Sequence, residues 1–433
     1  MDNLKNIKQQ FFDSLKRGTG EAYLIAKMNP TIDFSNYIIK GTLNNYAYDG
    51  QCENSRAKYI FDIISTSNKK EKIRKAVLKG LETENTNTWN LTHLFDLAKF
   101  FAQQGDEQLR VAIHIRFFEN MIEGSSWVGY QQILELGGLR GLLFIAHKIG
   151  HYLEQNPDDS ENSSIIEHFQ ESNPEIDAME ELKKISVSNS YIRTYLDNIK
   201  RTEENWEKFK QPIKEFETII NEIGATKHSY IYLRNRNLTQ GELELIANKF
   251  LSEKDKFKKG QFLAIFSKYK FPFDYKPILD LAKEKPNGKN RLVEFAIEAV
   301  SFFQGNDIRQ FALDKLKVTN RPNLFIEMLK NNYKNGDHKL LKSIAKKYHS
   351  EHMIEQLASS FVAIYKANKT SECIEPLLEL YRKSNCGIHR HKIVEILIEN
   401  NLLPDYLNEE IKFDSYEKTR QLHRSNNSHS LLF

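Results

Sequence analysis

The sequence predicts an all-α fold: an α-solenoid of stacked antiparallel helix pairs, with a less regular helical N-terminal part. The main observation is a recurring helix-pair unit, whose first helices are expected to begin near Thr239, Tyr275, Asn306, Asp337 and Thr370, with a sixth start near Leu403. These starts are roughly 31 to 36 residues apart, which is the spacing of helical repeats. Helix breakers are also scarce, with 10 prolines and 19 glycines in 433 residues. Because each unit is too small to bury its own apolar face, the units must stack.

The N-terminal region, residues 1–153, is predicted to contain helix pairs of less regular spacing. Apolar residues recur every three or four positions in four segments, which predicts helices over residues 54–67, 69–82, 90–104 and 106–122. Gly105 and Asp106 predict a turn followed by a helix N-cap. The apolar stripe over 90–104 is wide, and this width is typical of a helix packed against neighbours on more than one side.

Residues 124–150 are rich in glycine. We expect Gly137 and Gly138 to end one helix in a left-handed turn, and Gly141 to let the next helix pack closely. The alternative is a ligand loop lined by backbone, but the glycines match neither the P-loop spacing nor the G-x-G-x-x-G spacing.

Composition divides the rest of the chain into four segments. Residues 154–177 are polar and acidic and predict a loop or linker. Residues 178–224 predict a long charged helical hairpin of two helices, 178–200 and 203–224, the second interrupted or kinked at Pro212. Residues 225–422 form the predicted repeat array, and residues 423–433 a frayed tail.

The array resembles a known class of repeat. Its pattern is L-x-x-L-A-K, matched with isoleucine in the first place by ILDLAK at residues 278–283, then a short turn and a second helix, with Asp-Ile-Arg opening a helix at residues 307–309. This pattern resembles the HEAT-like repeats, in which Asp and Arg near the start of the second helix tie adjacent repeats together. Asp307 with Arg309, and Asp106 with Arg110, occupy comparable places. The resemblance implies a solenoid whose extended surface binds another macromolecule.

The charge of the chain is unevenly distributed. Residues 1–150 carry 19 basic and 16 acidic side chains (+3), residues 151–224 carry 8 and 17 (−9), and residues 225–433 carry 35 and 25 (+10), which sum to +4. The acidic and basic faces either complement each other within the molecule or attract a charged partner.

The absence of a recognisable catalytic motif favours a non-enzymatic scaffold that binds a protein partner on the concave solenoid surface. The alternative is nucleic-acid binding by the basic array, where lysines alternate with aromatic residues; the candidate phosphate contacts are Lys256, Lys258, Lys259, Lys268 and Lys270. A base-reading glycosylase is disfavoured because none of the three tryptophans lies in the array.

Two histidine clusters contain residue types that bind metal ions. His147 and His151 have helical spacing, but Lys148 stands where a zinc protease needs glutamate. Cys386, His389 and His391 are the densest group of soft ligands, although the two histidines point to different sides of a helix. The commoner interpretation is a helix N-terminus with a buried thiol, so no cofactor is expected.

The sequence contains no window resembling a secretory signal and none with the roughly 20 apolar residues of a membrane span. The three cysteines make no disulfide framework. We therefore expect a cytoplasmic protein with no membrane partner.

The helix-pair register makes a prediction about stability. Leu378 is expected to be buried in an apolar run with Ile374, Leu377 and Tyr381, whereas Lys383 is expected to be exposed. In stacked repeats a truncation near Lys369 should act locally, at the new end of the array.

Overall fold

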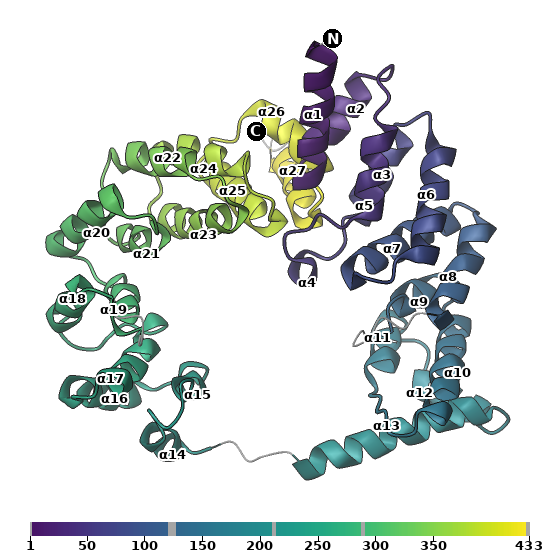
Figure 1. Cartoon of the computed structure of the whole chain (residues 1–433), viewed down its shortest axis with the longest axis horizontal. Helices are drawn as coiled ribbons and strands as arrows, with labels where there is room; N and C mark the ends of the chain where they lie inside the picture. Colours follow the sequence, from purple (N-terminus) through teal and green to yellow (C-terminus); the bar gives the residue numbers. More distant parts are fainter. Residues whose placement is uncertain (1, 120–126, 210–213, 287–290, 430–433) are drawn as a thin grey trace. The chain divides into compact units, whose positions relative to one another are not determined.

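The computed structural model describes residues 2–119, 127–209, 214–286 and 291–429. Within these ranges every regular element is a helix (Figure 1), which confirms the all-α prediction. No helix in these ranges is long and apolar enough to cross a membrane. Contacts divide the chain into unit 1, comprising Met1–Gln211 and Asn408–Phe433, and unit 2, comprising Pro212–Leu407. The five segments inferred from composition have other boundaries, and their status as domains stays a prediction.

Unit 1 is built mainly from the first thirteen helices of the chain. The first six are α1 (Asp2–Arg17), α2 (Glu21–Met28), α3 (Ser35–Leu43), α4 (Gly50–Glu53), α5 (Ala57–Ser65) and α6 (Lys70–Thr83). The next seven are α7 (Thr88–Gln103), α8 (Glu107–Glu119), α9 (Tyr130–Gly137), α10 (Leu139–Gln155), α11 (Ser164–Ser172), α12 (Ala178–Ser186) and α13 (Ser190–Phe209).

Unit 2 contains twelve α-helices and three short 3₁₀ helices in the part of it that is described. Its first half consists of α14 (Phe216–Asn221), α15 (Tyr230–Arg234), α16 (Gln240–Ser252), α17 (Lys256–Leu263), η1 (Ala264–Ser267), α18 (Lys276–Lys283) and α19 (Leu292–Val300). Its second half consists of α20 (Asn306–Val318), α21 (Asn323–Ile326), η2 (Glu327–Leu329), α22 (Asp337–Lys347), α23 (Glu351–Ala367), η3 (Ser371–Cys373), α24 (Ile374–Tyr381) and α25 (Gly387–Glu399).

The predicted helix starts in unit 2 coincide with helix N-termini. Thr239 is the N-cap of α16: its hydroxyl accepts the Glu242 amide at 3.3 Å, and its own amide donates to the Glu242 carboxylate at 2.7 Å. Tyr275 and Thr370 directly precede α18 and η3, while α20 and α22 begin at the predicted residues 306 and 337. At Thr239 and Thr370 the start follows from a side-chain cap that the sequence displays directly, whereas the N-cap residues of α18, α20 and α22 make no side-chain cap hydrogen bond.

Residues 154–224 differ from the sequence prediction. The segment expected to be a loop contains helix α11, whose Ile165, Ile166 and Phe169 are buried. The helix expected over 178–200 is divided into α12 and α13. The division follows from local hydrogen bonds: the Asn189 side chain accepts the Ile192 amide at 3.2 Å, and Arg193 donates to the carbonyls that end α12. Pro212, where a kink was expected, lies outside the described residues.

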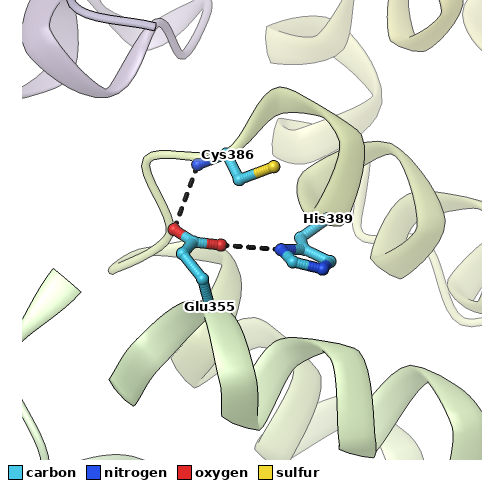
Figure 2. A group of neighbouring side chains, drawn as sticks. All are labelled: Glu355, Cys386 and His389. Carbon is cyan, nitrogen blue, oxygen red and sulfur yellow. Dashed lines mark hydrogen bonds and ion pairs between the residues drawn. The ribbon is translucent and has the colours of Figure 1, made fainter. Parts of the chain in front are cut away.

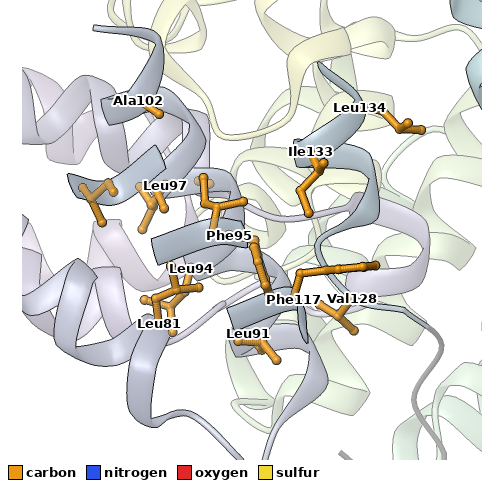
Figure 3. Packing of buried hydrophobic residues seen from close by; sticks show 14 of the residues in the cluster. Leu81, Leu91, Leu94, Phe95, Leu97, Ala102, Phe117, Val128, Ile133 and Leu134 are labelled. Carbon is orange, nitrogen blue, oxygen red and sulfur yellow. The ribbon is translucent and has the colours of Figure 1, made fainter. Parts of the chain in front are cut away.

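Helices α6, α7, α8 and α9 share part of the core of unit 1 (Figure 3). Leu94, Phe95 and Phe117 are at most 1% exposed there. The wide stripe of α7 is therefore covered on several sides, as predicted. The glycine-rich segment agrees with the prediction in part. Gly138 ends α9 at a positive φ of +54°, but its ψ of −132° is not that of the left-handed turn expected there. A Cβ at Gly141 would lie 2.5 Å from the carbonyl oxygen of Ile133, so this glycine does allow the close packing predicted for it.

The C-terminal segment belongs to unit 1 from Asn408 onward. Helix α26 (Asp405–Glu410) leads into η4 (Ile411–Phe413) and α27 (Glu417–His429). Phe413 stacks on Tyr23 of α2 with ring centroids 4.2 Å apart, and the Ser415 amide donates to the carbonyl of Gly18 at 2.8 Å. The expectation that truncation acts only at the end of the repeat array is therefore wrong. Of the segment expected to fray, residues 423–429 are helical and residues 430–433 lie outside the described residues.

Lys383 is not the freely exposed residue that the sequence suggested. Its ammonium group donates to the carbonyls of Ala345, Lys346 and Tyr348 at 2.8, 3.0 and 3.2 Å, and its side chain is 21% exposed. These carbonyls end helix α22, where a cation is favourable. The assigned register is also shifted at Leu378, which is only half-buried, whereas Leu377 is fully buried.

Two bidentate ion pairs join helices that are separated by about thirty residues of sequence. Arg74 of α6 donates to both carboxylate oxygens of Asp106, and the Leu109 amide donates to Asp106 Oδ1 at 3.1 Å, so Asp106 caps α8 as predicted. In unit 2, Arg309 of α20 donates to both carboxylate oxygens of Asp337 at 2.6 and 2.7 Å.

The aspartate and the arginine of each motif matched to the HEAT-like pattern do not pair with each other. Arg110 lies 3.2 Å from Glu107 rather than pairing with Asp106. Asp307 accepts the Tyr275 hydroxyl at 3.0 Å rather than pairing with Arg309. The aspartate–arginine pairs of this fold therefore join helices whose paired residues are 32 and 28 positions apart in the sequence.

Candidate functional site

The His147 and His151 pair on α10 is packed against an aromatic ring. Both imidazoles make edge contacts with Tyr191 of α13, at centroid distances of 5.0 and 4.8 Å. His147 Nδ1 also lies 3.0 Å from the side-chain nitrogen of Asn189. The contacts of these histidines are therefore those of a packed interface between α10 and α13.

Cys386 and His389 meet a third residue that the sequence did not single out. Cys386 is the N-cap of α25 and His389 lies in its first turn, while Glu355 comes from the neighbouring helix α23. One ligand atom from each of the three side chains lies within 4.8 Å of the others, the sole such trio of potential metal ligands in the described ranges. Figure 2 shows the Glu355 carboxylate and the His389 ring pointing toward each other, with the Cys386 side chain beside them.

Glu355 is 3% exposed and several hydrogen-bond donors surround its carboxylate. Oε1 accepts the backbone amides of Asn385 and Cys386 at 2.7 and 3.0 Å, and the Ser384 hydroxyl lies within 3.0 Å of both oxygens. Oε2 lies 2.8 Å from His389 Nδ1. A side chain of α23 thus supplies the N-terminal cap that α25 lacks in its own sequence.

The electrostatics of this cluster favour an ionised Glu355 carboxylate and a protonated His389 ring. Burial opposes ionisation of Glu355, but hydrogen bonds from His389, the Cys386 amide and Ser384 hold the pKa of that carboxyl below its usual range. Burial would likewise lower the pKa of His389, yet its contacts with Cys386 and Glu355 raise it to about 9. The imidazolium form is therefore stabilised by the groups around it.

His391 lies outside this cluster. Its Nε2 atom is 3.3 Å from a carboxylate oxygen of Glu395, on the same helix. Arg390 is fully buried beside the cluster and donates to the carbonyls of Ser384 and Asn385 at 3.3 and 3.0 Å. The structure thus brings together two of the three predicted soft ligands and adds a carboxylate, for which the sequence near Glu355 offers no signal.

The lysines of the candidate nucleic-acid surface lie in and after α17, and several make contacts within the chain. Lys256 is 3.4 Å from a Glu284 carboxylate oxygen, and Lys268 donates to the Arg234 carbonyl at 3.0 Å. The ammonium groups of Lys259 and Lys270 lie over the rings of Phe250 and Phe303 at 5.2 and 5.1 Å. Of the set, Lys256, Lys258, Lys268 and Lys270 are exposed and Lys259 is half-buried.

Helix α8 has apolar side chains on two opposite faces. Leu109, Ile113 and Phe117 form the inner face and are at most 1% exposed. The other face, which we call the α8 outer face, consists of Val111, Ile115 and Phe118, at 54%, 53% and 50% exposure. Their i, i+4, i+7 spacing places these three side chains on one ridge of the helix.

Cationic and aromatic groups from α10 border the α8 outer face. The Lys148 ammonium lies 4.0 Å from the centroid of the Phe118 ring, and the His151 ring lies 6.2 Å from the same ring. His114 of α8 packs edge-on against Phe144 of α10. The ridge is therefore apolar along its crest and basic along the side next to α10.

Comparison of the chain with protein-family models, with curated proteins and with solved structures gave no match.

Proposed function

We propose that the chain is a non-enzymatic scaffold and that a protein partner docks an amphipathic helix on the α8 outer face. The observation that carries the proposal is the second apolar face of α8. A helix that is apolar on two sides is normally covered on both. The described part of this chain covers the inner face and leaves Val111, Ile115 and Phe118 half exposed.

The chemistry of the ridge indicates what kind of helix fits it. Side chains spaced i, i+4, i+7 pack into the grooves of a second helix. The three side chains present on the order of 250 Å² of apolar surface, and covering it is worth about 6 kcal/mol before the costs of association. Lys148 borders the ridge, so an acidic residue beside the apolar face of the partner helix would complement it.

The helix arrangement is compatible with a repeat scaffold. In unit 2, contacts join sequence neighbours such as α16 with α17 and α24 with α25, and also next neighbours such as α17 with α19 and α23 with α25. This pattern supports the proposal that HEAT-like pairs stack into a solenoid, whose function lies in its surface. With all three cysteines free, we expect the scaffold to work in the cytoplasm.

A pair of substitutions tests the docking surface. Ile115→Glu places a charge at the centre of the ridge, and Val187→Glu places the same charge on an isolated side chain that is 78% exposed. Both should unfold within about 0.5 kcal/mol of wild type. A partner recovered by crosslinking from the native source is then purified and titrated calorimetrically against the three proteins.

We expect Ile115→Glu to weaken the complex about 30-fold or more, corresponding to about 2 kcal/mol, because a carboxylate would be buried unpaired. Val187→Glu should bind like wild type. Equal binding by all three proteins would refute the docking surface. Self-association that Ile115→Glu abolishes would show that the ridge binds a second copy. A salt-sensitive complex with RNA or DNA that is indifferent to Ile115→Glu would favour the basic array instead.

A further inference from the structure

The cluster of Glu355, Cys386 and His389 combines three different donor types. A carboxylate oxygen, a thiol sulfur and an imidazole nitrogen lie within 4.8 Å of one another. Glu355 and Cys386 are 3% and 5% exposed, and the His389 side chain is 19% exposed. Such a buried mixed set differs from the exposed acidic groups that occur on any protein surface.

The carboxylate is held in place by groups that would not compete for a metal ion. The backbone amides of Asn385 and Cys386 hold Oε1 of Glu355, which leaves Oε2 facing His389 (Figure 2). Metal-bound carboxylates are typically oriented by hydrogen bonds of this kind. The Ser384 hydroxyl, within 3.0 Å of both oxygens, limits rotation of the group further.

We propose that Glu355, Cys386 and His389 bind a single zinc ion. Thiolate and imidazole ligands select zinc over magnesium or calcium, and three protein ligands with one open position make a tetrahedral site that water completes. The partial exposure of His389 places that position toward solvent. With the thiol deprotonated, two anionic ligands balance the charge of the ion. Zinc would then join α23 to the first turn of α25.

Cobalt(II) substitution tests the site on the full-length protein. Co²⁺ is titrated into the metal-free protein, and absorption is recorded for the thiolate-to-cobalt charge-transfer band and for the visible bands of tetrahedral cobalt. We expect one Co²⁺ per chain with both features, displaced stoichiometrically by Zn²⁺, and a thermal midpoint that rises by several degrees in Zn²⁺.

The variants separate this site from other ligands. Cys386→Ser should abolish the charge-transfer band and His389→Gln should weaken binding at least tenfold. Cys52→Ser, at an exposed cysteine, and His391→Gln should leave the titration unchanged. Circular dichroism checks that each variant is folded. The proposal would be overturned if the folded wild-type protein bound no stoichiometric cobalt or bound it without a thiolate charge-transfer band. It would also be overturned if Cys386→Ser showed the same band as wild type.

Discussion

Replacing Lys383 by methionine removes one ammonium group from a position where three backbone carbonyls converge. The carbonyls belong to Ala345, Lys346 and Tyr348, at the end of α22. Methionine keeps most of the aliphatic stem, so the loss is confined to the charge, its hydrogen bonds and its ion pair with Glu379 at 3.1 Å. The helix then ends with carbonyl groups that have lost their partner.

The expected cost follows from the geometry. A hydrogen bond to a charged group contributes about 1.5–3 kcal/mol, and a cation at a helix C-terminus adds about 0.3–1 kcal/mol. Water can replace the ammonium at the exposed Lys346, and the Lys383 side chain is itself 21% exposed. We therefore expect the three contacts together to contribute about 2 kcal/mol, below the sum of three separate bonds.

Hydrogen exchange with mass spectrometry measures this effect where it occurs. A loss of about 2 kcal/mol should speed exchange in the last turn of α22 by about 30-fold where local opening governs exchange. Far-UV circular dichroism measured against urea concentration follows the loss of helix in the whole chain, unit 2 included. Tryptophan fluorescence is a useful contrast, because Trp89, Trp127 and Trp206 all belong to unit 1.

The matched control is Arg382→Met, which removes the same charge from the preceding, exposed residue. It should change stability by no more than about 0.5 kcal/mol and leave exchange in α22 as in wild type. If the two variants exchange and unfold alike, the capping role assigned to Lys383 is refuted.

Three further results are expected from substitutions and a deletion. Deleting residues 408–433 should lower the urea midpoint of the tryptophan signal, because Phe413 stacks on Tyr23 within unit 1; an unchanged tryptophan transition would contradict this packing. Leu377→Asp should destabilise unit 2 by more than about 4 kcal/mol and clearly more than Leu378→Asp, because only the first side chain is fully buried; circular dichroism melts of the two variants compare them. Asp106→Asn keeps an N-cap but loses the ion pair that lowers the pKa of Asp106, so it should cost about 1 kcal/mol at pH 7. Because the folded pKa lies below the unfolded value of 3.8, this difference should persist above pH 3.8 and vanish as the pH falls through the folded pKa; a difference that is unchanged at pH 2 would argue against the ion pair.

The sequence by itself determined where several helices begin. Thr239 with Glu242, and Gly105 with Asp106, are signals contained within four residues, and both mark helix N-termini in the structure. Hydrogen bonds of this kind form between groups that the chain already holds close together. A local hydrogen bond also explains why the helix predicted over 178–200 is divided near Asn189. The Asn189 side chain bonds to the backbone and so offers it an alternative to a continuous helix.

Tertiary structure decided which helix faces are buried and which distant side chains come into contact. The α8 outer face is visible in the sequence only as one of two apolar stripes, and packing in unit 1 selected the other as the buried one. Cys386 and His389 are predictable as neighbours on one helix turn. Glu355 is more than thirty residues away, and only the packing of α23 against α25 brings it to them.

The same separation explains the remaining differences. Lys383 finds its carbonyl partners 35 to 38 residues earlier in the chain, and Phe413 finds Tyr23 at the opposite end of it. Periodicity and capping residues describe each helix alone, whereas these contacts depend on how whole helices pack. The sequence therefore predicted the positions of individual helices. Which buried polar groups pair, and which apolar face of a helix is buried, depended on the tertiary structure.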